Sequence, residues 1–84
     1  MAWRFVGGPH EFEGTEAGGD IAVGWSWDLE RDGVRRTIEA EISDSDRQGR
    51  FGFQDAEQAV IDVLEEDDPP QRLVVTDTGA VIRA

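Results

Sequence analysis

Residues 44–55, DSDRQGRFGFQD, hold the side chains whose types and spacing best suit metal binding. A twelve-residue calcium-binding loop takes oxygen ligands from alternating positions and needs a glycine at its sharp bend. In this stretch Asp44, Asp46 and Gln48 offer side-chain oxygens, Gly49 follows them, and Asp55 stands at the twelfth position. The spacing therefore makes a single calcium-binding loop one hypothesis for this chain.

Several features of the sequence favour a simpler interpretation of that stretch. Asp55 is one methylene shorter than the bidentate glutamate that usually closes such a loop, and Gln48 offers a neutral oxygen. Residues 28–39, DLERDGVRRTIE, place acids, a glycine and a closing glutamate at the same positions, across a predicted hairpin turn. Two such loops so close together cannot both lie between helices, so at least one match is accidental. The alternative is a solvated acidic turn, after which Asp55 caps a helix.

His10 is the only histidine, and Glu11 and Glu13 stand close to it in the chain. Catalysis requires a nucleophile, a base and a stabilising group that face one another, and a lone histidine in a glycine-rich segment supplies only one of these. The sequence has neither a glycine-rich phosphate-binding loop before a helix nor a recognisable nucleophile–base pair. We therefore expect no catalytic residue, no cofactor and no enzymatic activity.

The charge balance is strongly acidic. Nineteen Asp and Glu residues face eight basic residues, all of them arginine, and the net charge is −11. An acidic, lysine-free surface is typical of a protein adapted to high salt, where ions screen the self-repulsion. A GC-rich genome that encodes basic residues as arginine explains the composition equally well. Direct binding to nucleic acid is disfavoured, because phosphates require a cationic face.

The same charge suggests a second possible function. A compact domain with a strong negative field attracts basic partners. An acidic decoy that occupies the nucleic-acid groove of a basic protein is therefore an alternative to the calcium-binding hypothesis. Such a decoy is expected to gather its carboxylates on one face.

The length of 84 residues predicts one domain, over residues 1–84, with a small core. Small cores give marginal stability, so we expect self-association, most simply as a homodimer. Cysteine is absent, which excludes disulfides and thiolate metal sites. The longest nearly apolar run, IAVGWSW, is far too short to span a bilayer, and no targeting segment is recognisable. We expect a cytoplasmic protein that does not contact membranes.

The most regular pattern in the chain predicts a β-hairpin. Residues 21–30 alternate apolar and polar side chains, which indicates a strand with one buried face. Residues 31–33, RDG, predict a hairpin turn. Residues 34–43 also alternate, although Val34, Ile38 and Ile42 are spaced as on a helix; the preceding turn favours a strand. Before the hairpin we predict a short strand over residues 3–7 and a loop over residues 8–20.

The second half of the chain predicts a helix and another hairpin. Asp55 and Gln58 suit a capping box at the start of a helix over residues 55–66. Its apolar face consists of Ala56, Ala59, Val60, Val63 and Leu64. Residues 69–70, PP, prevent its continuation. Strands are predicted over 72–76 and 80–83. The order β-ββ-α-ββ predicts a two-layer α+β domain, with an antiparallel sheet of about five strands and the helix on one face.

Trp25 and Trp27 lie on the same face of the predicted strand 21–30. Packing of both rings in the core is the favoured interpretation. The alternative is that they reach an interface with another protein, where tryptophan is enriched.

The pattern Trp25-x-Trp27-x-Leu29, then a turn, a strand ending Ser43-x-Ser45, an aromatic residue and a helix with Ala56, Ile61 and Val63, resembles the YegP-like small domains of unknown function. The resemblance covers roughly residues 21–64. It implies a βββα unit that associates in pairs, and it implies no activity. The N-terminal strand, the segment 44–50 and the C-terminal hairpin depart from that family's pattern.

Overall fold

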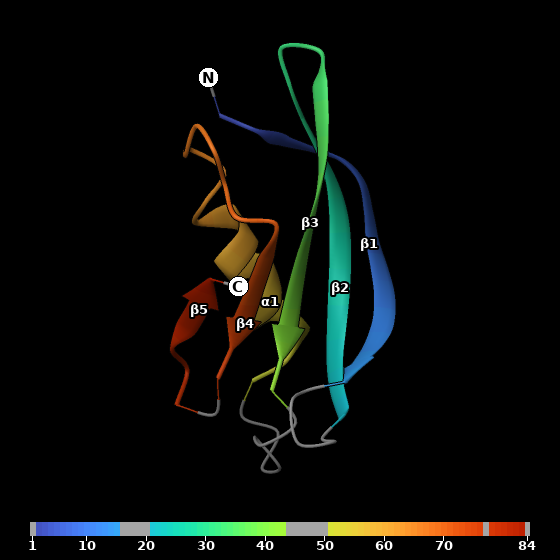
Figure 1. Ribbon diagram of the computed structural model, residues 1–84, viewed down its shortest axis with the longest axis vertical. Helices are drawn as coiled ribbons and strands as arrows, with labels where there is room; N and C mark the ends of the chain where they lie inside the picture. Colours follow the sequence, from blue (N-terminus) through green and yellow to red (C-terminus); the bar gives the residue numbers. More distant parts are fainter. Residues whose placement is uncertain (1, 16–20, 44–50, 77, 84) are drawn as a thin grey trace.

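The computed structural model describes residues 2–15, 21–43, 51–76 and 78–83 (Figure 1). Five strands form one sheet in the order in which they occur in the chain. They are β1 (Arg4–Thr15), β2 (Ile21–Arg31), β3 (Val34–Ile42), β4 (Arg72–Val75) and β5 (Val81–Arg83), and one helix, α1 (Phe53–Ile61), packs on one face of the sheet. The predicted α+β fold class is confirmed.

The hairpin of β2 and β3 forms as its alternating pattern predicts. Asp32 and Gly33 connect the strands, and both have positive φ angles, of 51° and 80°. Two adjacent residues with positive φ are typical of a type I′ turn, whose twist matches that of the flanking strands. The regular register runs from Arg31 opposite Val34 to Val23 opposite Ile42. Residues 34–42 are therefore a strand and not a helix.

β1 extends much further than the sequence predicts. It continues through Gly7, Gly8 and Pro9 to Thr15, so the predicted strand end at Gly7 is wrong, and residues 8–15 of the predicted loop form a strand. Between the paired residues Gly7–Asp28 and His10–Ser26, two β1 residues lie opposite one β2 residue. This β-bulge on an edge strand accommodates a proline, which cannot donate a ladder hydrogen bond.

The sheet is mixed, whereas the sequence predicted an antiparallel one. β3 and β4 run in parallel, with Ala40 opposite Leu73 and Ile42 opposite Val75. The two arrows point the same way in Figure 1, while β5 returns antiparallel to β4. Parallel neighbours need a long crossover connection, and the segment containing α1 provides it.

The core lies between α1 and the sheet. Apolar residues of β2, β3 and β4 form its sheet side, and the helix contributes the apolar face that its sequence predicts. The buried residues are Trp3, Trp27, Leu29, Ile38, Ala40, Ile42, Ala56, Ala59, Val60, Val63, Leu73 and Val75. Because successive strand residues point to opposite faces, the other side chains of β2 and β3 lie on the face away from the helix. We call this the open face.

The ends of α1 differ from the prediction. The helix starts at Phe53, after the cap residue Gly52, and ends at Ile61, five residues before the predicted end. The Asp55 carboxylate accepts a hydrogen bond of 2.8 Å from the Gly52 N–H, so Asp55 caps the helix from its third position. Gln58 does not complete the predicted box, and its side-chain amide donates to Asp62.

The acidic residues after α1 form ion pairs with distant arginines. Arg31 pairs with Asp67 at 3.2 Å, and Arg36 pairs with Asp68 at 2.8 Å. Both guanidinium groups also lie over the buried Trp3 ring, at 4.7 and 5.4 Å from its centroid. These contacts hold the segment before β4 against the hairpin beyond the end of the helix, and cation–π attraction adds to the ion pairs.

Candidate functional site

The open face of the sheet has a layer of ion pairs between neighbouring strands. Glu30 on β2 accepts hydrogen bonds from Arg4 on β1, at 2.7 Å, and from Arg35 on β3, at 3.2 Å. The Arg4 hydrogen bond, followed by the Arg35 hydrogen bond, holds the pKa of Glu30 below its ordinary value. Both arginine side chains are largely exposed, whereas Glu30 is partly buried between them. Because the guanidinium groups remain in solvent, each pair adds little to the free energy of unfolding.

Glu41 is a charged residue buried on this face, with only 3% of its surface exposed. Its carboxylate accepts a 2.7 Å hydrogen bond from Arg72 on the parallel strand β4. Gly24, its neighbour on β2, lies beneath the Phe12 ring of β1. A Cβ atom at position 24 would stand 2.6 Å from Phe12 and 2.9 Å from the Glu41 side chain. Phe12, Gly24 and Glu41 therefore pack tightly.

His10, Asp28 and Thr37 form a row across the open face. The Thr37 hydroxyl donates to Asp28 Oδ1 at 3.2 Å, and His10 Nε2 lies 3.9 Å from Asp28 Oδ2. In a nucleophilic triad the imidazole stands between the hydroxyl and the carboxylate, so that it can take the hydroxyl proton. Here the carboxylate is in the middle, and no imidazole contacts the hydroxyl. This order does not activate Thr37 as a nucleophile.

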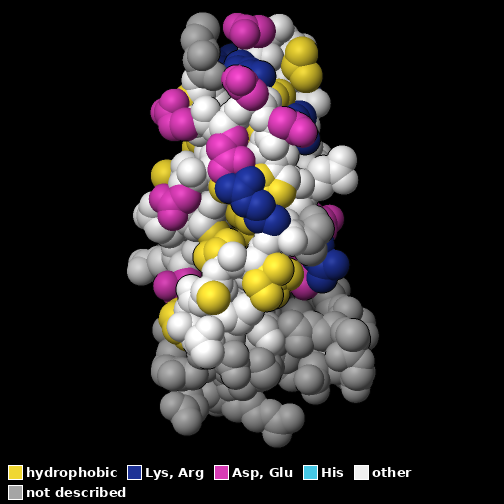
Figure 2. Space-filling model, turned by 60° about the vertical axis from the view of Figure 1, so that its left-hand side comes forward, with side chains coloured by type: hydrophobic (Ala, Val, Ile, Leu, Met, Phe, Trp, Pro, Cys, Tyr) yellow, Lys and Arg dark blue, Asp and Glu magenta, His cyan; other side chains and the backbone are white. Residues whose placement is uncertain are grey.

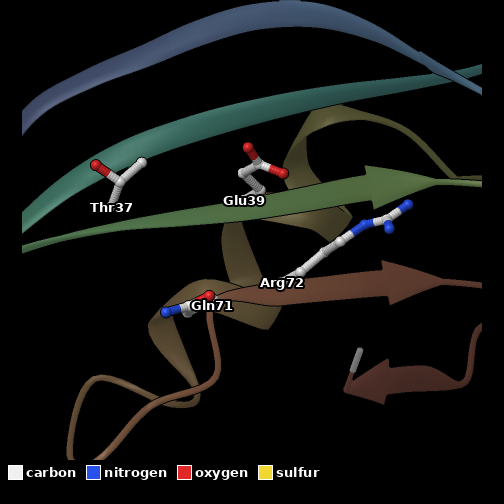
Figure 3. Close-up of a pocket in the computed structure, with 4 residues that line it drawn as sticks. All are labelled: Thr37, Glu39, Gln71 and Arg72. Carbon is white, nitrogen blue, oxygen red and sulfur yellow. The ribbon is translucent and has the colours of Figure 1, made fainter.

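A groove of about 510 Å³ opens beside this row, where β3 meets the beginning of β4. Thr37, Glu39, Gln71 and Arg72 line it (Figure 3). Thr37 and Glu39 project from β3 on the side of the sheet away from α1, and Arg72 extends from β4 toward β3. All of the lining side chains are polar, which suits hydrogen bonding to a ligand better than enclosing an apolar one.

A second groove lies on the helix face, between α1 and β5. Two adjoining hollows of about 170 and 190 Å³ share Ala59, Asp62 and Val81 in their walls. Leu73 and Val75 of β4 contribute further apolar walls. Figure 2 brings the left-hand side of Figure 1, where β5 lies, toward the reader, and hydrophobic side chains are exposed there among acidic and basic ones. This groove has a more apolar lining than the one on the open face.

The calcium-binding hypothesis depends mainly on residues that the structure does not describe. Asp44, Asp46 and Gln48 lie outside the described residues. Asp55 is described, and its carboxylate is engaged with the Gly52 N–H. Among the described residues, no group of three or more His, Asp or Glu residues could hold a metal ion. Residues 28–39, which share the spacing, form the β2–β3 hairpin, so that second match is accidental.

Both tryptophans of β2 lie on the helix face. Trp27 is 2% exposed and belongs to the core. Trp25 is half-buried and packs edge-to-face on Phe53, with ring centroids 5.3 Å apart. The interface role of Trp25 and Trp27 stays a prediction, and of the two only Trp25 keeps an appreciable exposed surface. His10, the other residue considered from the sequence, is exposed near Asp28.

Neither groove was identified from the sequence. Each one forms where residues from separate segments meet, such as Thr37 and Gln71 on the open face, or Ala59 and Val81 on the helix face. Locally, the sequence showed only that Val81 and Ile82 are two apolar residues of the predicted strand 80–83. The order of strands in the sheet was needed to place that strand at an edge.

Comparisons of the chain with protein-family models, with curated proteins and with solved structures find no match. Among the described residues, no helix is long and apolar enough to cross a membrane.

Proposed function

We propose that this protein is a non-enzymatic binding module that pairs with a second copy of itself through β5. The proposal rests on one observation: β5 is an edge strand whose Val81 and Ile82 side chains are 49% and 52% exposed. Adjacent residues of a strand point to opposite faces, so both faces of this edge present apolar surface. An apolar edge strand with unpaired backbone groups favours pairing with another strand.

The two edges of the sheet differ in how well they are protected. β1 has register shifts on both sides of Gly7, and it contains Pro9. Bulges and prolines are the features by which natural sheets block strand addition. β5 has neither, and its only charged residue, Arg83, is bound by both Glu66 oxygens at 2.6 and 2.5 Å. Strand addition is therefore favoured at β5.

A second copy suits this edge for reasons of symmetry and shape. Antiparallel pairing of β5 with the same strand of another copy places the same residues on both sides of a two-fold axis. The groove between α1 and β5 adjoins Val81, so apolar surface beside the strand is also available for contact. Burial of this surface adds a hydrophobic contribution to the few backbone hydrogen bonds of a three-residue strand.

Charge sets the condition under which pairing is expected. Each copy has a net charge of −11, so two copies repel each other at low ionic strength. Because the screening length falls from about 30 Å at 0.01 M salt to about 3 Å at 1 M, repulsion between copies weakens as salt rises. We therefore expect monomers at low salt and dimers in molar potassium chloride.

Light scattering coupled to size-exclusion chromatography tests the proposal directly. The wild-type chain should double its mass between low and molar salt. Val81→Glu should remain monomeric throughout, because it places a charge on the paired edge. Val34→Glu is the matched control. Val34 is also exposed, at 57%, but it lies beside the β2–β3 hairpin turn and far from β5 in the strand order. The two variants have the same net charge. A wild-type monomer at high concentration and high salt, or equal loss of dimer in both variants, contradicts the proposal.

A further inference from the structure

β3 is longer than β4, its parallel neighbour in the sheet. Its register with β4 begins only at Glu39 opposite Arg72, whereas β3 itself begins at Val34. Residues 34–38 therefore have β2 on one side and, among the described residues, no strand on the other. We call this free edge, together with the groove lined by Thr37, Glu39, Gln71 and Arg72, the β3 notch.

The backbone groups at the β3 notch have a definite direction. The Glu39 N–H donates to Gln71 O at 2.9 Å, and the Ser43 N–H donates to Val75 O at 3.0 Å. In an antiparallel hairpin, backbone groups of alternate residues point to opposite sides of the strand. The odd-numbered residues of β3 thus turn their N–H and C=O groups toward the β4 side. By the same alternation, Arg35 and Thr37 present these groups to the free edge.

The chain before β4 leaves this edge uncovered for a structural reason. Asp67 and Asp68 pair with Arg31 and Arg36, two residues whose side chains lie on the helix face of the hairpin. Pro69 follows and is fully buried. Continued in the same register, Pro69 would lie opposite Arg36, and it has no N–H to donate to Arg35 O, so the parallel ladder cannot continue through this residue. The space on the open face remains as the groove of about 510 Å³.

The charges around the β3 notch favour a basic occupant. Arg35 is engaged with Glu30, and Arg72 is engaged with Glu41. An acidic ligand would have to break one of these pairs. Glu39, in contrast, lines the groove and has no ion pair among the described residues. The net charge of −11 also attracts cationic segments from a distance.

We propose that the β3 notch binds an extended, basic peptide segment of another protein as an added strand. The peptide backbone pairs with the free N–H and C=O groups of Arg35 and Thr37, and a cationic side chain contacts Glu39. In strand addition of this kind, main-chain hydrogen bonds provide affinity and side-chain contacts provide selectivity.

Fluorescence anisotropy with a labelled eight-residue peptide of alternating arginine and threonine tests this proposal. Thr37→Pro removes the N–H that faces the notch and leaves the hydrogen bonds to β2 in place. It should weaken binding about tenfold, the upper range for one lost hydrogen bond. Thr37→Val keeps the N–H, so it should lose less affinity than Thr37→Pro does. Equal binding by Thr37→Pro and wild type overturns the proposal.

Two further comparisons separate strand addition from general charge attraction. Glu39→Gln should weaken binding about threefold, as expected for an exposed ion pair. Glu57→Gln, on α1, makes the same charge change elsewhere and should have no comparable effect; an equal effect overturns the proposal. If Thr37→Pro fails to fold, a peptide methylated on alternate backbone nitrogens replaces it as the test. Unchanged affinity of the methylated peptide also overturns strand addition.

Peptide binding at the β3 notch does not depend on self-association through β5. Val81→Glu should leave peptide binding unchanged whether or not the wild type dimerises. Loss of the dimer in Thr37→Pro, without loss of peptide binding, would assign the notch to a second copy of the chain and would contradict a peptide partner.

Discussion

The two faces of the sheet are built from alternate residues of the same strands, yet they differ in side-chain polarity and in burial. On the helix face, Ile38 and Ala40 are buried against α1 with their apolar neighbours. On the open face, Thr37 and Glu39 from the same strand line a polar groove. The difference shows that the period-two pattern of β2 and β3 gives the sheet a mainly apolar layer of side chains on one face and a mainly charged layer on the other. Most charged residues of the two strands lie on the open face, whereas Arg31 and Arg36 lie on the helix face, where they contact Trp3.

Glu41 and Arg72 form an ion pair on the open face that, unlike the other pairs there, includes a buried carboxylate. Glu41 belongs to the polar layer by its position but is as buried as the core residues. A buried charge is costly unless it has a partner. The ion pair with Arg72 therefore has a structural role that the exposed pairs of Glu30 do not have.

The largest difference between the faces should appear when adjacent residues of β3 are truncated. Ile38→Ala leaves a cavity in the core and should lower the free energy of unfolding by about 2–5 kcal/mol. Thr37→Ala changes an exposed residue and should cost less than about 1 kcal/mol. Urea denaturation followed by tryptophan fluorescence measures both. Similar losses for the two variants would mean that the faces are equally important for stability.

Removal of the Arg72 guanidinium should cause the next largest loss in the free energy of unfolding. Arg72→Met leaves Glu41 buried without its guanidinium partner and should cost about 1–3 kcal/mol, the range for a buried unsatisfied polar group. Arg35→Met removes a guanidinium from an exposed pair and should cost no more than about 1 kcal/mol. Urea denaturation again supplies the measurement. The double variant Glu41→Gln/Arg72→Met should be more stable than Arg72→Met alone, and the opposite order would refute a special role for the buried pair.

Overfilling the open face should have a similar or smaller effect. Gly24→Ala forces Phe12 away from Glu41, since the added methyl group would stand 2.6 Å from the ring. We expect a loss of about 1–3 kcal/mol, as for other overpacked sites. In a Phe12→Leu background the same substitution should cost less, because the side chain in its way is smaller. Thermal melts of the wild type, the two single variants and the double variant reveal this coupling, and strictly additive losses would argue against it.

The smallest effect should come from the pH dependence of the exposed ion pairs. The Arg83 hydrogen bond holds the pKa of Glu66 below its ordinary value. Since the folded pKa is lowered, the stabilising contribution is present above the ordinary carboxyl pKa and is lost as pH falls through the folded value. Glu66→Gln should therefore lose less stability on acidification than the wild type. Arg83→Met, which removes the donor and leaves the carboxylate in place, should lose the same pH-dependent contribution. A wild-type profile in both variants would show that the Glu66–Arg83 pair does not contribute to the pH dependence.

The sequence was sufficient wherever structure depends on near neighbours. The β2–β3 hairpin followed from alternation and from the Asp32-Gly33 turn, because both act between adjacent residues. The apolar face of α1 followed from helical spacing for the same reason. The boundaries of α1 were less well predicted, since Asp55 suits a cap from either the first or a later position. The predicted helix 55–66 included Glu65 and Glu66, whereas α1 ends at Ile61 and leaves both residues beyond it. The arginine partners of the carboxylates in 65–68 were not identified.

The tertiary structure alone decided which distant segments meet. β1 remains a strand through Gly7 and Pro9 because β2 is beside it, and a bulge absorbs the extra residues. The parallel direction of β4 follows from the path of the crossover segment. Both grooves, the burial of Glu41 beside Arg72, and the contacts of Asp67 with Arg31 join residues more than thirty positions apart or from separate elements. Local periodicity contains no information about such pairs, because they form only when the strand order brings their segments together.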